Sequence, residues 1–115
     1  MIKLQGSIVI NRPVEQVYEF MANIDNIMKW DSEAVKFRQV SPGPVGVGTK
    51  LEVEYESRGK PLILNVVITG KDLNKRVSYT IESRVANGMT QYSFEPVDSG
   101  TRFTKYQEVE GKGFL

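Results

Sequence analysis

The chain contains no cysteine and no histidine among its 115 residues. The lack of cysteine excludes disulfides, thiolate catalysis and cysteine-bound metals. The lack of histidine removes the usual general base near neutral pH and the commonest metal ligand. A metal site would need carboxylates alone, and no group of Asp and Glu has the spacing of such a site. We therefore assign no catalytic residue and expect no metal and no cofactor.

Long apolar runs and an excess of one charge are also missing. No apolar run of about 18 residues and no signal-peptide pattern is present, which predicts a chain without a transmembrane segment, located in the cytoplasm. The 15 Lys and Arg nearly balance the 14 Asp and Glu, for a net charge of +1. Nucleic-acid binding needs a basic stripe, so we expect no nucleic-acid partner. The length of 115 residues, 40% of them hydrophobic, fits a single domain with a thin core.

The order of the predicted elements is the most informative feature that is present. Residues 2–10 predict a strand, and Pro13 begins a helix, because proline in a first helical turn has no N–H to leave unpaired. A second short helix, capped by Asp25, ends at Trp30, and from Val35 onward the pattern predicts only strands and turns. This order points to a sheet that curls around a cavity, so a hydrophobic ligand is the first functional question.

Three of the later strands alternate clearly enough to show which side chains share a face. In strand 49–57 a second, wet face carries Lys50, Glu52, Glu54 and Glu56. Segment 61–69 is apolar on both faces, so its phase stays open, and Asn87-Gly88 predicts a hairpin turn. The three sets that share a face are Leu51, Val53 and Tyr55; Val77, Tyr79 and Ile81; and Thr90, Tyr92 and Phe94.

Loose motifs are spread over essentially the whole chain. They are Ile8-Val-Ile-Asn-Arg-Pro13, Val17-Tyr-Glu-Phe20, Asp25 to Trp30-Asp31, Gly46-Val-Gly-Thr49, Gly100-Thr-Arg-Phe-Thr104 and Glu110-Gly111. Through them the chain resembles the START/Bet v 1-like superfamily, in its polyketide cyclase/dehydrase-like (SRPBCC) branch. The resemblance implies an α+β helix-grip fold. In it, a curved seven-stranded antiparallel sheet, with two short helices after strand 1, curls around a C-terminal helix and an apolar cavity.

The chain departs from this pattern at residues 111–115, where the C-terminal helix should begin. We interpret residues 1–115 as a single domain that is truncated before that helix. The concave face would then be exposed as one apolar patch, and monomers seldom expose more than about a few hundred Å² of that kind. We therefore expect a homodimer or another cover, either a swapped element or a bound apolar molecule. The residues of the expected patch are Leu51, Val53, Tyr55, Tyr79, Tyr92 and Phe94.

The predicted ligand site is the inward face of the sheet together with Trp30. The indole of Trp30 either walls one end of a pocket, with its N–H free for a ligand, or plugs the end of the barrel as a core residue. The inward aromatic residues form either a cavity floor or an ordinary core. The predicted ligand-binding residues are Trp30, Leu51, Val53, Tyr55, Tyr79, Tyr92, Phe94, Phe103 and Lys105.

The direction in which the Lys105 side chain points depends on the phase of strand 101–109. If that strand shares the phase of Phe103, then Lys105 and Gln107 point into the cavity, where the amine could act as a base or bind an anion. In the other phase Tyr106 and Arg102 point inward, and Lys105 is solvated.

Three further cations lie on predicted loops. Arg58, Lys60 and Arg84 fall on two loops that gate the cavity mouth in ligand-binding members of the superfamily that the chain resembles. There they would suit a carboxylate or phosphate on an apolar ligand. Alternatively, they are charged hairpin tips in solvent.

Three functions stay open at this point. The first is binding of a hydrophobic small molecule or lipid-like ligand without covalent chemistry, which the absence of His and Cys favours. The second is a polyketide cyclase or dehydratase activity, implied by the resemblance, with Tyr79, Tyr92 or Lys105 as proton carriers. The third is a protein-interaction domain that uses the sheet face.

Overall fold

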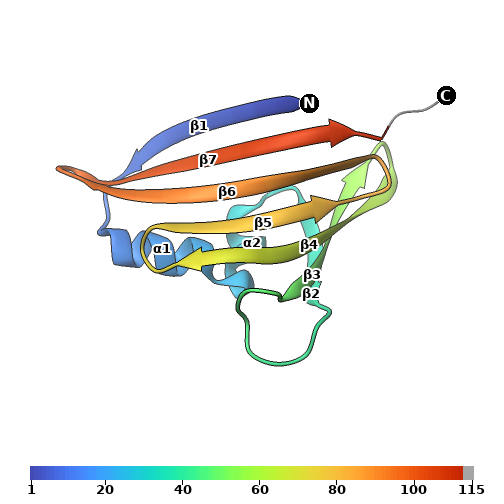
Figure 1. Cartoon of the computed structure of the whole chain (residues 1–115), viewed down its shortest axis with the longest axis horizontal. Coiled ribbons are helices and arrows are strands. Elements are labelled where there is room, and N and C mark those ends of the chain that lie inside the picture. Colours follow the sequence, from blue (N-terminus) through green and yellow to red (C-terminus); the bar gives the residue numbers. More distant parts are fainter. Residues whose placement is uncertain (113–115) are drawn as a thin grey trace.

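The computed structural model describes residues 1–112 and contains one seven-stranded sheet and three short helical segments. The predicted order of strand, short helices and antiparallel meander is confirmed (Figure 1). Part of the segment in which the C-terminal helix was expected to begin lies outside the described residues. The bounds are β1 Ile2–Ile10, α1 Val14–Ala22, the 3₁₀ helix η1 Ile24–Asn26, α2 Ile27–Trp30, β2 Ala34–Gln39, β3 Lys50–Ser57, β4 Lys60–Asp72, β5 Arg76–Glu82, β6 Ala86–Val97 and β7 Gly100–Gly111.

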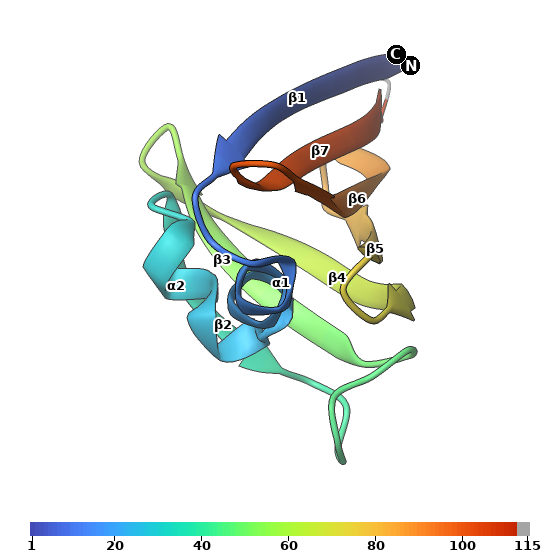
Figure 2. The same cartoon turned by 90° about the vertical axis from the view of Figure 1, so that its left-hand side faces the viewer.

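The sheet has the order β1-β7-β6-β5-β4-β3-β2, and all of its neighbouring strands are antiparallel. The strands β1 and β2 follow each other in the chain but lie at opposite edges of the sheet. The segment 11–33 therefore has to cross from one edge to the other. Figure 2 looks along α1 and shows the sheet curving around this crossing segment.

The helix α1 packs one apolar face against the middle of the sheet. Val17, Tyr18 and Ala22 are buried in one cluster with the strand residues Val77, Tyr92 and Phe94. The i, i+3, i+4 spacing of the predicted helix places such residues on one side. The rings of Tyr18 and Phe94 meet edge to face at 5.2 Å. These contacts fix the helix against β5 and β6.

The short helices η1 and α2 cover the neighbouring part of the concave face. Ile24 and Ile27 are buried in a second cluster with Leu51 and Val53 of β3. The prediction that Asp25 caps this turn is wrong. The side chain of Asn23 accepts a hydrogen bond of 3.0 Å from the backbone N–H of Asp25 instead. An Asn carbonyl two residues ahead of that N–H suits this role.

The apolar patch expected on the concave face is not exposed as predicted. Leu51, Val53, Tyr92 and Phe94 are all less than 10% exposed, because the helical segments lie on them. Exposed apolar side chains instead mark β1, at the edge that these helices do not reach. They are Ile2, Leu4, Ile8 and Val9, each at least 50% exposed.

The turn between β5 and β6 differs from the predicted Asn87-Gly88 hairpin. Asn87 lies within β6 and pairs with Glu82 of β5. The turn that joins the two strands is formed by residues 83–85, which precede the predicted Asn87-Gly88 pair. There the Ser83 hydroxyl accepts hydrogen bonds of 3.2 Å from the backbone N–H groups of Val85 and Ala86. The turn chemistry therefore comes from a serine, which the dipeptide pattern did not indicate.

The phase of β4, which the sequence left open, is set by its pairing with β3. Leu64 lies opposite Val53, and Val66 lies opposite Leu51, so these side chains share the concave face. Ile63 lies on the other face and is 37% exposed. Segment 61–69 is apolar on both faces because its outward face also carries apolar side chains, such as Ile63, that are exposed.

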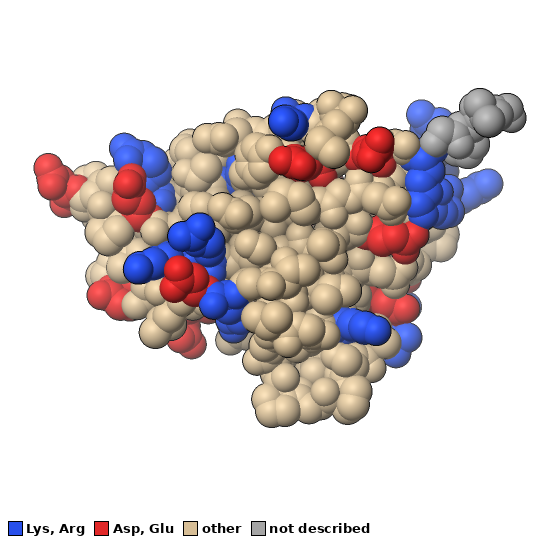
Figure 3. All heavy atoms as spheres, viewed as in Figure 1, with Lys and Arg blue, Asp and Glu red and all other residues tan. Residues whose placement is uncertain are grey.

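The outer face of β3 is charged in the way that the alternation predicts. Arg38 of β2 donates from Nε to a carboxylate oxygen of Glu52 at 2.9 Å, and Lys36 lies 3.7 Å from Glu54. On the face shown in Figure 3, acidic and basic side chains are interspersed. Within residues 1–112, none of the helices has the length and apolar character that crossing a membrane requires.

The backbones of β6 and β7 approach each other closely at Gly88. A Cβ atom at this position would lie 2.2 Å from the backbone oxygen of Glu108, whereas a Cβ at Gly6 in β1 would meet nothing within 4 Å. We expect Gly88→Ala to lower the free energy of unfolding by about 2 kcal/mol or more, because backbone must move to admit the methyl group. Urea unfolding measures this. Gly6→Ala is the matched control and should be close to neutral, and equal effects of the two substitutions would contradict the close approach.

Candidate functional site

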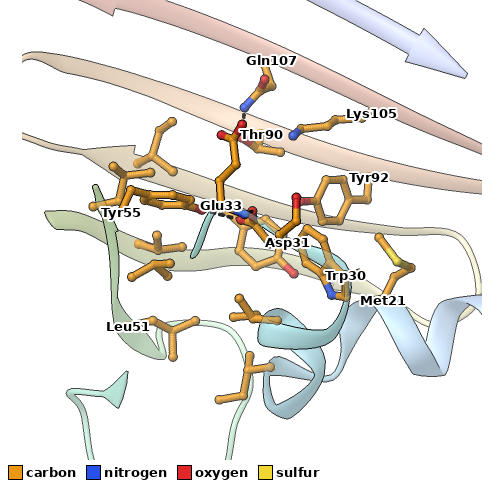
Figure 4. Close-up of a pocket in the computed structure, with 18 of the residues that line it drawn as sticks. Met21, Trp30, Asp31, Glu33, Leu51, Tyr55, Thr90, Tyr92, Lys105 and Gln107 are labelled. Carbon is orange, nitrogen blue, oxygen red and sulfur yellow. Dashed lines mark hydrogen bonds between the residues drawn. The ribbon is translucent and has the colours of Figure 1, made fainter. Parts of the chain in front are cut away.

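A cavity of about 440 Å³ lies between the concave face of the sheet and the crossing helical segment. The later part of the crossing segment, from Met21 to Glu33, and strands β3 to β7 contribute to its wall, and Figure 4 shows most of these side chains. The lining residues are Met21, Ile24, Ile27, Trp30, Asp31, Ser32, Glu33, Leu51, Val53, Tyr55, Leu64, Val66, Tyr79, Ile81, Thr90, Tyr92, Phe103, Lys105 and Gln107.

The floor of the cavity is aliphatic. Alternate residues of β3, β4 and β5 point to the same side of a sheet, which brings their apolar side chains together. The register confirms this, since Leu51 pairs with Val66, and Val66 with Ile81. An apolar floor of this kind excludes ordered water and favours a hydrocarbon surface.

Tyr92 lies at the centre of the aromatic part of the wall. Its ring centroid lies 5.8 Å from Trp30, 5.6 Å from Tyr79 and 5.3 Å from Phe103. The first two pairs are edge to face, which is a favoured arrangement of aromatic rings. Mutual packing therefore holds these rings in place without a ligand.

Trp30 combines the two roles that the sequence left as alternatives. Its indole packs against both core clusters and also lines the cavity. The Nε1 atom is buried and has no hydrogen-bond partner among residues 1–112. A buried donor without a partner costs free energy, so it is a candidate for a hydrogen bond to a ligand or to water.

A polar edge of the cavity follows directly after Trp30. Asp31 accepts a hydrogen bond of 2.6 Å from the Tyr55 hydroxyl through one oxygen, and one of 3.2 Å from the backbone N–H of Glu33 through the other. Sequence reasoning missed Asp31, Ser32 and Glu33 as lining residues. Their position could have identified them, because they lie between the crossing helices and β2, where the chain returns to the sheet edge.

The cavity tyrosines hold their protons strongly. Burial raises the pKa of Tyr55, with the hydrogen bond to Asp31 as the next cause. Burial also raises the pKa of Tyr92, followed by the nearby Tyr79 and Asp31. For Tyr79, burial raises the pKa to about 12. At neutral pH these side chains are therefore hydrogen-bonding phenols and not bases.

The structure adopts the phase of β7 in which Lys105 and Gln107 share the face of Phe103. Gln107 donates from Nε2 to the Thr90 hydroxyl at 3.1 Å. Lys105 is exposed and also lines a second hollow of about 390 Å³, which lies over β1. The two hollows share Phe103, Lys105 and Gln107, so the second hollow lies beside the cavity on the side of β1.

Four predicted site residues do not line the cavity. Phe94 is 4% exposed and belongs to the core under α1. Arg58 and Lys60 lie at the turn between β3 and β4, and Arg84 lies at the turn between β5 and β6. None of these three cations is among the lining residues. The other predicted residues, from Trp30 to Lys105, are brought together.

The whole-chain comparison identifies the class of protein. The sequence profile of the family described as "Polyketide cyclase / dehydrase and lipid transport" matches residues 1–115. The chain belongs to this family. No curated protein matches the sequence.

Solved structures share the helix-grip architecture of this sheet and its two short helices. The Zhui aromatase/cyclase from Streptomyces sp. R1128 superposes with a TM-score of 0.84 at 10% identity, covering 99% of this chain and 70% of that chain. A START superfamily protein from Mycobacterium smegmatis gives 0.82 at 12% identity, covering 98% and 79%. Ara h 8.0201 gives 0.77 at 16% identity, covering 99% and 80%. At these identities the likeness shows the fold alone.

The raised tyrosine pKa values predict an alkaline limit of stability. All five tyrosines, Tyr18, Tyr55, Tyr79, Tyr92 and Tyr106, are shifted upward in the fold. A pKa raised above the unfolded value contributes stability that is complete below about pH 10 and is lost as the pH rises through the folded pKa. For Tyr79 that window runs from 10.0 to about 12.

A spectrophotometric titration of tyrosinate, followed together with circular dichroism, checks this prediction. We expect little tyrosinate in the native protein at pH 10, and about half of the tyrosines ionised in denaturant at the same pH. Native ionisation that matches the denatured curve would contradict the buried, hydrogen-bonded environment.

Proposed function

We propose that the protein binds a hydrophobic small molecule or lipid-like ligand in this cavity without covalent chemistry. The observation that carries the proposal is the preformed cavity of about 440 Å³, with an aliphatic floor and a few convergent polar groups. Its volume lies within the range of about 300–1,000 Å³ that is typical of small-molecule sites. Membership of a family whose description includes lipid transport supports the same reading.

Burial of the ligand's apolar surface supplies the affinity, at about 25 cal/mol per Å² removed from water. Orientation comes from the polar groups in the wall. The Tyr92 hydroxyl lines the cavity and has no hydrogen-bond partner among the described residues, so it can bond a ligand. Trp30 Nε1 also lacks a partner there, but this atom is buried. Because the rings that carry these groups are already packed, little side-chain entropy is lost on binding.

A cyclase or dehydratase activity is the second candidate. The hydrogen-bonded pair of Asp31 and Tyr55 places a carboxylate and a phenol in the same cavity, which one acid–base step would need. The likeness to a structure that is named an aromatase/cyclase supports this alternative. The raised pKa values of Tyr55 and Tyr92 make them weak acids, so in this reading they orient the substrate by hydrogen bonding and Asp31 is the acid–base group. Turnover that is lost in Tyr55→Phe would favour it over binding alone.

The remaining expectations from the sequence stay predictions. They are a homodimer or another cover over the concave sheet face, a cytoplasmic location and the absence of a nucleic-acid partner. Native mass spectrometry of the purified chain measures its oligomeric state together with the mass of any bound small molecule. We expect a discrete extra mass that is lost on denaturation, which would also give the mass of a co-purified ligand.

The single tryptophan lines the cavity, so its fluorescence reports occupancy. Titration with n-decanol, an uncharged probe, should give a saturable change in Trp30 fluorescence. We expect Leu64→Gln, which places an amide in the cavity floor, to weaken decanol binding about tenfold or more, because a buried polar group without partners is costly.

Ile63→Gln is the matched control, since Ile63 neighbours Leu64 on the same strand but lies on its other face. This variant should bind decanol like the parent protein. Urea unfolding of both variants establishes that each is folded. A linear, non-saturating change in the parent protein, or equal losses in both variants, would argue against binding in the cavity.

A further inference from the structure

Two of the three charged side chains that line the cavity are acidic, opposite in sign to the cations expected at its mouth. Arg58, Lys60 and Arg84 do not line the cavity, as described above. Two carboxylates do, Asp31 and Glu33, and they come from the loop between α2 and β2. The cavity wall therefore presents negative charge beside its aromatic part.

Asp31 is held at the centre of this polar edge. Its carboxylate is fixed by the Tyr55 hydroxyl at 2.6 Å and by a backbone N–H at 3.2 Å, so its position does not depend on a ligand. Figure 4 shows Tyr92 extending from β6 toward Asp31. The Tyr92 side chain is only 6% exposed and lines the cavity, and its hydroxyl has no hydrogen-bond partner among residues 1–112. A fixed carboxylate and an unpaired phenol hydroxyl thus face the same space.

Neither carboxylate has a cationic partner in the part of the chain that the structure describes. The ion pairs there join Lys36, Arg38, Arg76, Arg102 and Lys112 to other acids. Carboxylates that border an apolar cavity without a counter-ion favour a cation in that cavity. Glu33 is exposed and lies at the outer limit of the wall, where a head group would enter.

The aromatic residues beside Asp31 favour the same charge. Trp30, Tyr55, Tyr79, Tyr92 and Phe103 all line the cavity, and the faces of aromatic rings attract cations. An anionic head group would find repulsion from these faces and from both carboxylates. The one cation in the wall is Lys105, which is exposed and stands on β7 beside the second hollow.

We propose that the cavity selects hydrophobic amines: ligands with an apolar body and a protonated amine that lies between Asp31, Glu33 and the Tyr92 hydroxyl. This inference rests on the proposed function and adds the charge of the head group to it. The apolar body lies on the aliphatic floor, and the amine donates hydrogen bonds to the carboxylates. Such charge-assisted bonds are stronger than neutral ones.

The experiment compares three probes with the same chain, n-decylamine, n-decanoate and n-decanol, by Trp30 fluorescence at pH 7. At this pH the amine is cationic and the acid anionic. We expect the amine to bind about tenfold more tightly than decanol, and decanoate to bind most weakly. Equal affinities, or a preference for decanoate, would overturn the amine selectivity and leave the proposed function intact. Saturable binding of none of the probes would overturn both.

Two variants test whether the carboxylates of Asp31 and Glu33 cause the preference for the amine. Asp31→Asn keeps an acceptor for Tyr55 but removes the charge, and Glu33→Gln changes an exposed position with little risk to folding. Each should reduce the preference for the amine over decanol about three- to tenfold, while decanol binding persists. Glu56→Gln, on the outer face of β3, is the matched control and should retain the preference.

Lys105→Met tests the competing charge in the wall. Removal of this cation should raise the affinity for the amine, because a repulsive charge is lost. If Asp31→Asn and Glu33→Gln both keep the full amine preference, the proposed position of the head group is wrong. A decanoate preference that disappears in Lys105→Met would instead assign an anionic ligand to the cavity.

Discussion

The fold depends on one topological constraint: β1 and β2 are adjacent in the chain and lie at opposite edges of the sheet. The segment 11–33 joins them by crossing the concave face (Figure 2). Its start is fixed by Thr101, which is fully buried and donates from its hydroxyl to the backbone oxygen of Arg12 at 2.8 Å. Gly100 lies so close to Ile10 that a Cβ atom there would meet its carbonyl oxygen at 2.1 Å. The crossing segment therefore begins at the turn between β6 and β7.

The cavity is a consequence of how this segment touches the sheet. The helix α1 packs against β5 and β6, while η1 and α2 pack against β3 and β4, so two separate core clusters form. Trp30 contacts both clusters, and the space beside it remains open to the strands. The residues that return the chain to the sheet edge, Asp31 to Glu33, then close one side of that space with polar groups. The core and the cavity wall thus share some of the same side chains.

The sequence predicted those parts of the fold that follow from the alternation of apolar and polar residues along a strand. The alternation of Leu51, Val53 and Tyr55 identified a strand and its inward face, because each of these residues is flanked on both sides by charged residues of the wet face. Val66 and Lys105 could not be phased in this way, since their faces are decided by pairing with another strand. Asn87-Gly88 misled because the local turn signal was outweighed by the ladder with β5 and by the turn around Ser83. The acidic edge at Asp31 was missed because its place depends on where the crossing segment ends in space, which no local pattern encodes.

The edge strand β1 differs from the other six strands because it contributes no buried side chain. It pairs only with β7, and its residues from Ile2 to Val9 are all exposed. Few buried contacts would be lost if it separated from β7, so it belongs to the class of segments that undergo sub-global unfolding well below the free energy of the whole domain. We therefore expect the amide hydrogens of β1 to exchange ahead of those in β3 to β6. Because the hollow over β1 shares Phe103 and Lys105 with the cavity wall, separation of β1 from β7 would also change the space beside the cavity while both helical clusters stay packed.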